Sequence, residues 1–148
     1  MFRRGRPEGR EDGSRRGRVP VPGKGEMMGW SFNDGSPIYL QLCDVIKSRI
    51  ASGAYGPRQK LPPVRDLALE AGVNPNTVQR AYAELERDGL VNADRTSGRF
   101  VTADGEKIKT LRAMLSSGYI GELFERLRGL GLSDDEIRAA VNEWGYLK

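Results

Sequence analysis

The chain has 148 residues, of which 38% are hydrophobic and 30% charged, and its formal net charge is +4. These values suit one ordinary domain or two small ones, and no apolar run approaches the roughly 20 residues that a membrane helix needs. One cysteine and no histidine exclude an internal disulfide, zinc sites built on Cys/His clusters and His-based catalysis. We therefore expect no enzymatic activity, no metal and no cofactor, no membrane association, and a cytoplasmic location.

The positive charge is concentrated at the N-terminus. Residues 1–26 hold eight of the 24 basic residues and four of the 20 acidic ones, so residues 27–148 are neutral overall. Residues 1–29 are also rich in Gly, Arg and Pro, and such a segment cannot bury enough apolar surface to fold. We predict a disordered basic N-terminal extension over 1–29. It is either an arm that adds nonspecific phosphate contacts or, as we prefer, an extended start before an initiator at Met27 or Met28.

The first helix is predicted over residues 37–52. Ser36 can cap it, Pro37 suits its first turn and Gly53 suits its end. Apolar residues at helical spacing form its inward stripe, which comprises Ile38, Leu42, Val45, Ile46 and Ile50. Cys43 lies beside this stripe, and we interpret it as a buried small hydrophobic residue rather than a redox sensor. Residues 54–61 form a loop or a short extended piece.

Two further helices and a hairpin follow. The second helix covers 63–70 with Leu67 facing inward, and Gly72 makes the turn after it. Asn74 caps the third helix, Pro75 fills its first position, and Gly89 stops it. Residues 90–91 and 100–101 are short strand candidates around a polar turn centred on 96–98. This order predicts a winged helix-turn-helix over residues 30–104.

The C-terminal segment, residues 105–148, is helical again. Its apolar positions recur at three- and four-residue steps from Ile108 to Leu130, and Gly118 and Gly121 can bend or divide this helix. Ser133 and Glu136 form a capping box for a last helix, which carries Ile137, Val141 and Trp144.

The apolar stripe of this segment is long for a chain with a small core. It either packs back on the first helix or, as we prefer, pairs with a second subunit, because an uncovered apolar surface is a liability. The predicted homodimer seam comprises Leu111, Leu115, Tyr119, Leu123, Phe124 and Leu127. The fold class is therefore mostly α with a small β-hairpin: a winged helix-turn-helix followed by a short two-helix C-terminal dimerisation tail.

The third helix has one apolar and one polar face. At 100° per residue, the inward face comprises Val78, Ala81, Tyr82 and Leu85. Asn76 and Arg80 lie opposite, with Thr77 and Gln79 on the flanks, all in the first two turns. Asn and Gln can pair with adenine and Arg with guanine. A polar face of this kind can also be simply solvated, but the preceding helix-turn and the following basic hairpin favour DNA.

Residues on three predicted elements complete this face. Lys60 and Arg65 can contact phosphates that flank the groove, and Gly98 lets the backbone approach the DNA closely. Arginine is favoured in a narrow minor groove, which suits the hairpin. The predicted DNA-binding residues are Lys60, Arg65, Asn74, Asn76, Thr77, Gln79, Arg80, Arg95, Ser97, Gly98 and Arg99.

Three stretches resemble the GntR family of bacterial transcriptional regulators: Leu-Pro-Pro-Val-Arg-Asp-Leu-Ala at 61–68, Asn-Pro-Asn-Thr-Val-Gln-Arg-Ala-Tyr at 74–82, and Ile-Tyr-Leu-Gln-Leu at 38–42 after Gly-Ser-Pro. The last two resemble the YtrA-type branch. The resemblance implies DNA-contacting roles for Arg65, Thr77, Arg80 and Gly98. Pro75 and Gln79 stand where the family often has arginine, so the operator should differ.

The resemblance also implies that the two-helix tail dimerises and that the regulated genes commonly form a transporter operon. The sequence thus predicts a sequence-specific DNA-binding transcriptional regulator, a dimeric repressor of a palindromic operator. The alternative is a winged-helix module that binds protein and no operator. The operator sequence, the regulated genes, the existence of a small-molecule effector, and repression as against activation stay open.

Overall fold

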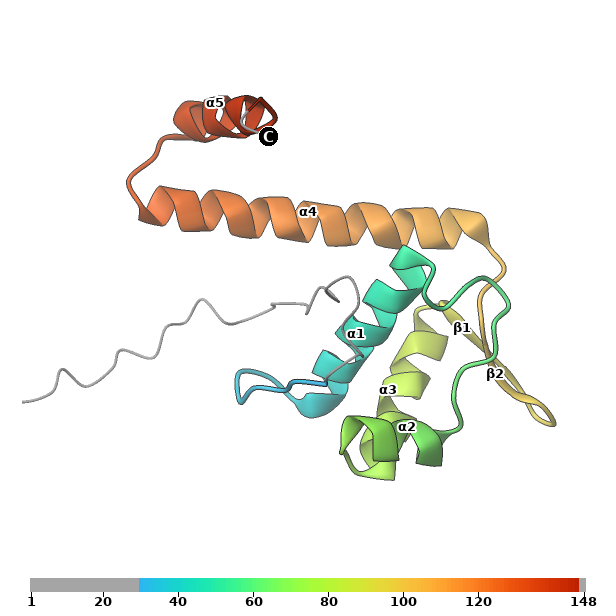
Figure 1. Cartoon of the computed structure of the whole chain (residues 1–148). Coiled ribbons are helices and arrows are strands. Elements are labelled where there is room, and N and C mark those ends of the chain that lie inside the picture. The colour runs from blue at the N-terminus through green and yellow to red at the C-terminus, as the bar shows by residue number, and fades with distance from the viewer. Residues whose placement is uncertain (1–29, 147–148) are drawn as a thin grey trace, which may run out of the picture. The chain divides into compact units, whose positions relative to one another are not determined.

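The computed structural model describes residues 30–146, so the extension predicted at 1–29 lies outside the described residues. The chain divides into two compact units, Met1–Ala103 and Asp104–Lys148, and each is described by itself. Helices and one two-stranded antiparallel sheet make up the described part (Figure 1). This confirms the predicted class, mostly α with a small β-hairpin.

The first helix, α1 (Ile38–Ser52), begins one residue later than predicted, and the prediction that Ser36 caps it is wrong. Pro37 occupies the N-cap position, and among the described residues no side chain makes a capping hydrogen bond there. Instead, Gln41 Nε2 donates to the backbone oxygens of Asn33 and Ser36, at 2.7 and 2.8 Å. The C-cap residue, Gly53, is left-handed at φ 84° as expected.

The inward face of α1 carries Leu42, Ile46 and Ile50, all buried. Val45 is half-buried, and Ile38 is exposed because it lies in the first turn, at the edge of the packed layer, so its predicted place in the stripe is wrong. Cys43 is buried, and its Sγ donates to the Ala81 carbonyl oxygen at 3.4 Å.

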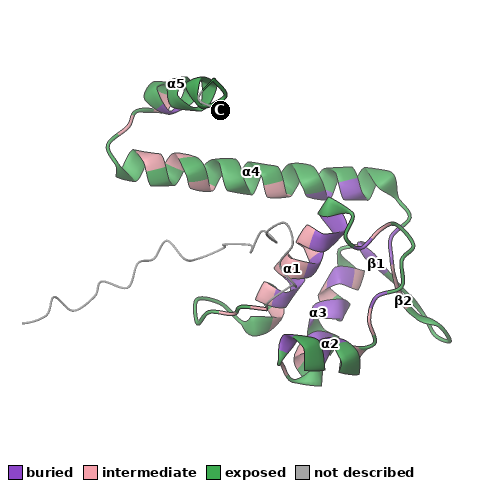
Figure 2. Cartoon of the chain, in the orientation of Figure 1, coloured by how far each residue is buried: buried purple, intermediate pink, exposed green. Residues whose placement is uncertain are grey.

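The helix-turn-helix consists of α2 (Val64–Ala71) and α3 (Pro75–Arg87). Gly72, left-handed at φ 68°, ends α2, and Asn74 Oδ1 accepts a hydrogen bond from the Asn76 N–H at 2.8 Å. The four predicted inward residues of α3 are all buried, and α3 packs on both α1 and α2. Figure 2 shows this buried surface along the facing sides of α1 and α3. Gly89, at φ 75°, follows the end of α3.

The hairpin consists of β1 (Val91–Asp94) and β2 (Gly98–Val101), paired from Val91↔Val101 to Asp94↔Gly98. The loop between α1 and α2 lies along the edge of β2 that does not pair with β1. The Leu61 N–H donates to the Arg99 carbonyl oxygen at 2.8 Å, and the Val101 N–H donates to the Gln59 carbonyl oxygen at 2.9 Å. The wing is therefore bonded to the segment that leads into α2.

The second unit contains α4 (Gly105–Gly129) and α5 (Asp134–Trp144). Gly118 and Gly121 do not divide α4, because the helix is continuous through both. Both capping-box bonds between Ser133 and Glu136 are present, as predicted. Of the three apolar residues predicted on the last helix, Ile137 is buried, whereas Val141 and Trp144 are exposed. Among residues 30–146, no helix is both long and apolar enough to cross a membrane.

Candidate nucleic-acid interface

The N-terminal turns of α3 present polar side chains to solvent. Asn76, Gln79 and Arg80 are exposed, and Thr77 is half-buried. Their inward neighbours fill the core, so the predicted division of α3 into two faces is present. Asn74, which the sequence also assigned to DNA, uses its Oδ1 atom to cap the helix. These side chains lie beside the backbone N–H groups at the start of α3, and N–H groups at a helix start favour the binding of an anion.

One flank of α3 is held by α1. The guanidinium carbon of Arg80 lies 3.8 Å from the centre of the Tyr39 ring, a cation–π contact. Further along, Lys47 Nζ lies 3.4 Å from Asp88 Oδ2. The stack restricts the rotamers that Arg80 can adopt, which lowers the entropy lost when it is ordered by a ligand. Sequence reasoning missed this role of Tyr39, because no local pattern joins residues so far apart.

The other flank of α3 is held by the wing. Arg99 Nε donates to Glu86 Oε1 at 2.6 Å, and the Arg99 guanidinium carbon lies 5.2 Å from the centre of the Tyr82 ring. The Tyr82 hydroxyl in turn donates to the Pro62 carbonyl oxygen at 2.7 Å. Burial raises the pKa of Tyr82 well above its usual value, so the hydroxyl stays protonated and keeps donating.

The tip of the wing is shaped by Asp94, which sequence reasoning also missed. Its Oδ1 accepts from the Thr96 N–H and Thr96 Oγ1, both at 2.9 Å, and from the Ser97 N–H at 3.4 Å. These hydrogen bonds, led by the Thr96 N–H, lower the pKa of Asp94. An Asp two residues before Thr-Ser-Gly is a recognisable turn pattern that could have found it. Arg95 and Ser97 are exposed at this tip.

Gly98 has a packing role beside the close approach to DNA predicted for it. Its φ of 106° suits glycine, and a Cβ atom there would lie 3.2 Å from Lys60 Cε. Gly98 therefore leaves room for the Lys60 side chain to lie along the wing. Lys60 itself is exposed, and so is Arg65, the second residue of α2. Of the cations predicted to bind DNA, Lys60, Arg65, Arg80 and Arg95 are exposed, whereas Arg99 is half-buried and engaged by a carboxylate.

In the second unit, the residues predicted for a dimer seam differ in exposure. Leu111 is buried, Leu115, Phe124 and Leu127 are half-buried, and Tyr119 and Leu123 are exposed. The guanidinium carbons of Arg128 and of Arg138, on α5, lie 5.6 and 5.8 Å from the centre of the Phe124 ring. Phe124 therefore takes part in the contact between α4 and α5.

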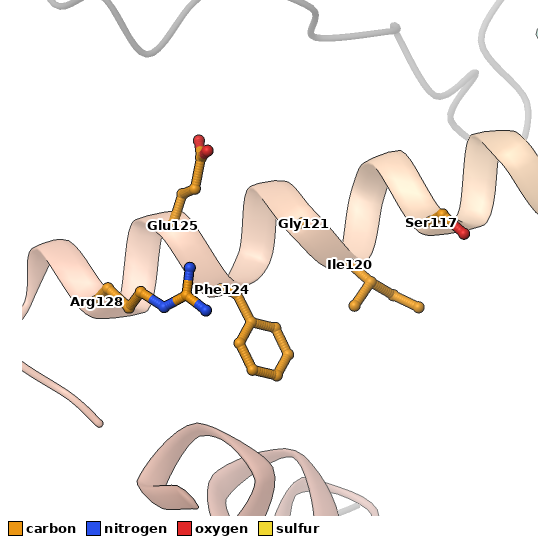
Figure 3. A pocket seen from close by; sticks show the side chains of 6 residues that line it. All are labelled: Ser117, Ile120, Gly121, Phe124, Glu125 and Arg128. Carbon is orange, nitrogen blue, oxygen red and sulfur yellow. The ribbon is translucent and has the colours of Figure 1, made fainter. Parts of the chain in front are cut away.

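A shallow open hollow lies on α4, lined by Ser117, Ile120, Gly121, Phe124, Glu125 and Arg128. Figure 3 shows Ile120 and Phe124 pointing to one side of α4 and Glu125 to the opposite side. The hollow has no enclosing wall. The residues that the structure describes include no group of three or more His, Cys, Asp or Glu side chains placed to hold a metal ion.

Comparison with known proteins places this geometry among DNA-binding regulators. Residues 38–101 match the family described as "Bacterial regulatory proteins, gntR family". The chain is 37% identical over 110 residues to the HTH-type transcriptional regulator YhcF of Bacillus subtilis, an alignment that covers 74% of this chain and 91% of YhcF. It is 39% identical over 71 residues to the HTH-type transcriptional repressor YtrA of B. subtilis, covering 48% and 55% of the two chains.

A solved structure of a GntR family transcriptional regulator from Listeria monocytogenes superposes with a TM-score of 0.68 at 35% identity, covering 76% of this chain and 98% of that one. A transcriptional regulator from Oenococcus oeni gives a TM-score of 0.63 at 29% identity, covering 76% and 94%. These alignments extend over the tail as well as the winged unit, and the similarity to YtrA agrees with the YtrA-type resemblance of the sequence.

Proposed function

Because the chain belongs to the GntR family of bacterial transcriptional regulators, we propose that it is a dimeric repressor that recognises a palindromic operator through α3. It is a DNA-binding transcriptional regulator by family. The proposal of operator recognition rests on the exposed polar side chains at the start of α3. The opposite face of the same helix packs into the core and fixes their position. The similarity to a protein named as a repressor supports repression over activation.

Each exposed side chain has a matching partner in duplex DNA. Asn76 and Gln79 can form paired hydrogen bonds with adenine in the major groove, and Arg80 with guanine. Thr77, half-buried at the N-terminal end, suits a phosphate or a thymine methyl group. Lys60, Arg65 and Arg95 supply positive charge on the segments that flank α3, where phosphate contacts set register and orientation.

Dimerisation is proposed for the tail, residues 105–148. Its two helices leave large apolar side chains exposed, among them Ile120, Leu123 and Trp144. Monomeric proteins rarely leave such surface uncovered, and a second copy offers the same apolar face. Two copies would present two α3 helices about 34–36 Å apart, or a multiple of that distance, as a palindromic operator requires. The controlled genes are proposed to form a transporter operon.

The test is duplex binding by fluorescence anisotropy, with DNA from the protein's own promoter region and a shuffled duplex as control. We expect tighter binding to the promoter fragment, with log Kobs falling linearly with log salt by about 0.9 per phosphate contact. Footprinting should show two protected half-sites. No duplex binding at low salt, or affinity independent of salt, would instead identify a winged-helix module that binds protein.

A further inference from the structure

The wing and the recognition helix are joined by one short ion pair that the proposed DNA contacts do not use. Arg99 lies on β2 and Glu86 near the end of α3, and their Nε···Oε1 distance is 2.6 Å. The two side chains are 23% and 32% exposed, so water screens the pair only in part. A charge-assisted hydrogen bond of this length is among the stronger kinds in proteins.

Arg99 is held at its backbone as well as at its side chain. The Arg99 carbonyl oxygen accepts from the Leu61 N–H at 2.8 Å, and Arg99 lies opposite Ala93 in the register of the hairpin. Its guanidinium lies over the ring of Tyr82, whose hydroxyl is bonded to the Pro62 carbonyl oxygen. A DNA phosphate would have to compete with Glu86 and this aromatic ring for the Arg99 guanidinium.

Glu86 also needs a cation for electrostatic reasons. It lies on α3, C-terminal to the residues proposed to contact bases, and an uncompensated carboxylate there would repel the DNA phosphates. Arg99 neutralises it, so the pair adds no net charge to the DNA face. The exposed cation of the wing is then Arg95, at its tip.

We propose that Glu86 and Arg99 are positioning residues that fix the wing against α3, and that Arg95, not Arg99, makes the wing's phosphate contact. This inference rests on the proposed function, because it names which wing residue serves the operator. It separates two arginines that the sequence treats alike.

The decisive experiment compares salt slopes of operator binding in the full chain. The double variant Glu86→Gln/Arg99→Gln keeps the local net charge, and Arg95→Gln is the matched single loss of a wing cation. We expect the double variant to keep the wild-type slope while binding a few-fold more weakly. Arg95→Gln should reduce the slope by about 0.9 per half-site, or about 1.8 for the proposed dimer. A slope reduced by about 1.8 in the double variant and unchanged in Arg95→Gln would overturn the assignment.

A second experiment measures the pair without DNA. A double-mutant cycle of Glu86→Gln and Arg99→Gln in urea unfolding should give a coupling of about three- to tenfold in the unfolding equilibrium constant. The matched control is Arg87 with Glu84, whose side chains are 74% and 30% exposed at 3.2 Å and which should couple less than about twofold. No coupling for Glu86 and Arg99 would refute the inference.

The two experiments keep the proposals apart. If the wild-type protein binds no duplex, the proposed function fails, while the unfolding cycle still decides whether Glu86 and Arg99 hold the wing. If the wild-type protein binds its operator and the cycle shows no coupling, the positioning pair alone fails.

Discussion

The winged unit and the tail bury their apolar residues to very different extents. In the winged unit Ile46, Tyr82 and Leu85 are at most 1% exposed, whereas in the tail Ile120 is 57% and Trp144 61% exposed. The winged unit therefore closes its core with its own residues. The tail leaves large apolar side chains exposed, and the proposed dimer would cover them.

The ion pairs of the two units also differ in exposure, and the pair in the winged unit is the less exposed. In the winged unit, Arg99 pairs with Glu86 where both side chains are mostly covered. In the tail, Arg128 forms a two-pronged bond to Asp134 at 2.7 and 2.9 Å. Both side chains are about half exposed, so water screens this pair more than it screens Arg99 and Glu86. We therefore expect the tail, in isolation, to have a lower free energy of unfolding than the winged unit.

The largest expected effect tests this contrast directly. Ile46→Ala removes a fully buried side chain and should lower the free energy of unfolding by about 2–5 kcal/mol. Ile120→Ala removes an exposed one and should cost less than about 1 kcal/mol in dilute protein. Urea unfolding followed by circular dichroism measures both. Equal losses would mean that the tail has a core of its own.

The next effect tests what the tail surface is for. Leu123→Glu places a carboxylate on the proposed seam, so we expect monomers by light scattering. Operator binding should weaken about a hundredfold, because the second half-site contact becomes a separate event. Met114→Glu is the matched control, since nine residues at 100° put Met114 on the opposite side of α4. A Leu123→Glu protein that stays dimeric would exclude this seam.

The features that local rules govern were predictable from the sequence. Asn74 and Ser133 were identified as caps because a side chain and its own helix start are neighbours in the chain, and the inward face of α3 follows from helical periodicity. Ser36 is not the cap, because the helix begins one residue later and Pro37 takes the N-cap position. The Gln41 amide bonds the Asn33 and Ser36 carbonyl oxygens there. Nothing in the sequence indicates that the long Gln41 side chain folds back onto the backbone before the helix.

The features that join distant elements were not predictable in the same way. Tyr39 meets Arg80 only because α1 crosses α3 at that point, and Glu86 meets Arg99 only because the hairpin folds back. From the sequence, Arg95 and Arg99 are equivalent basic residues around one turn. They differ because Arg95 lies in the turn, whereas Arg99 lies on β2 within reach of α3, and this proximity is a tertiary property.

Base recognition gives the third effect. Arg80→Ala should cost roughly 1–3 kcal/mol of operator binding and relax the preference at one base step. Tyr39→Phe keeps the ring under Arg80 and should change little, whereas Tyr39→Leu should reduce the preference at the same step. Binding to a panel of single-base operator variants measures this. An equal loss on every sequence would make Arg80 a phosphate contact.

Helix caps provide a smaller effect that compares the two units again. Asn74→Ala and Ser133→Ala each remove one side-chain acceptor from a helix start and should each cost about 1 kcal/mol locally. In the winged unit the loss should lower the whole unfolding transition, because α3 is part of a common core. In the tail it should increase amide hydrogen exchange in α5 alone. A global shift for Ser133→Ala would show that α5 unfolds together with the rest.

The smallest effect concerns the wing turn and appears only in acid. Hydrogen bonds from Thr96 and Ser97 lower the pKa of Asp94 below its ordinary value, so the ionised carboxylate favours the folded turn. That contribution is complete above the unfolded pKa and is lost as the pH falls through the lowered folded pKa. The Thr96 amide shift in NMR should therefore titrate at a pH below the ordinary range of an aspartate side chain. Asp94→Asn should abolish the titration while leaving the turn's acceptor oxygen in place. A Thr96 midpoint within or above the ordinary aspartate range would mean that the turn does not depend on the charge, and that the wing holds its shape through β1, β2 and the Arg99 contact with Glu86 alone.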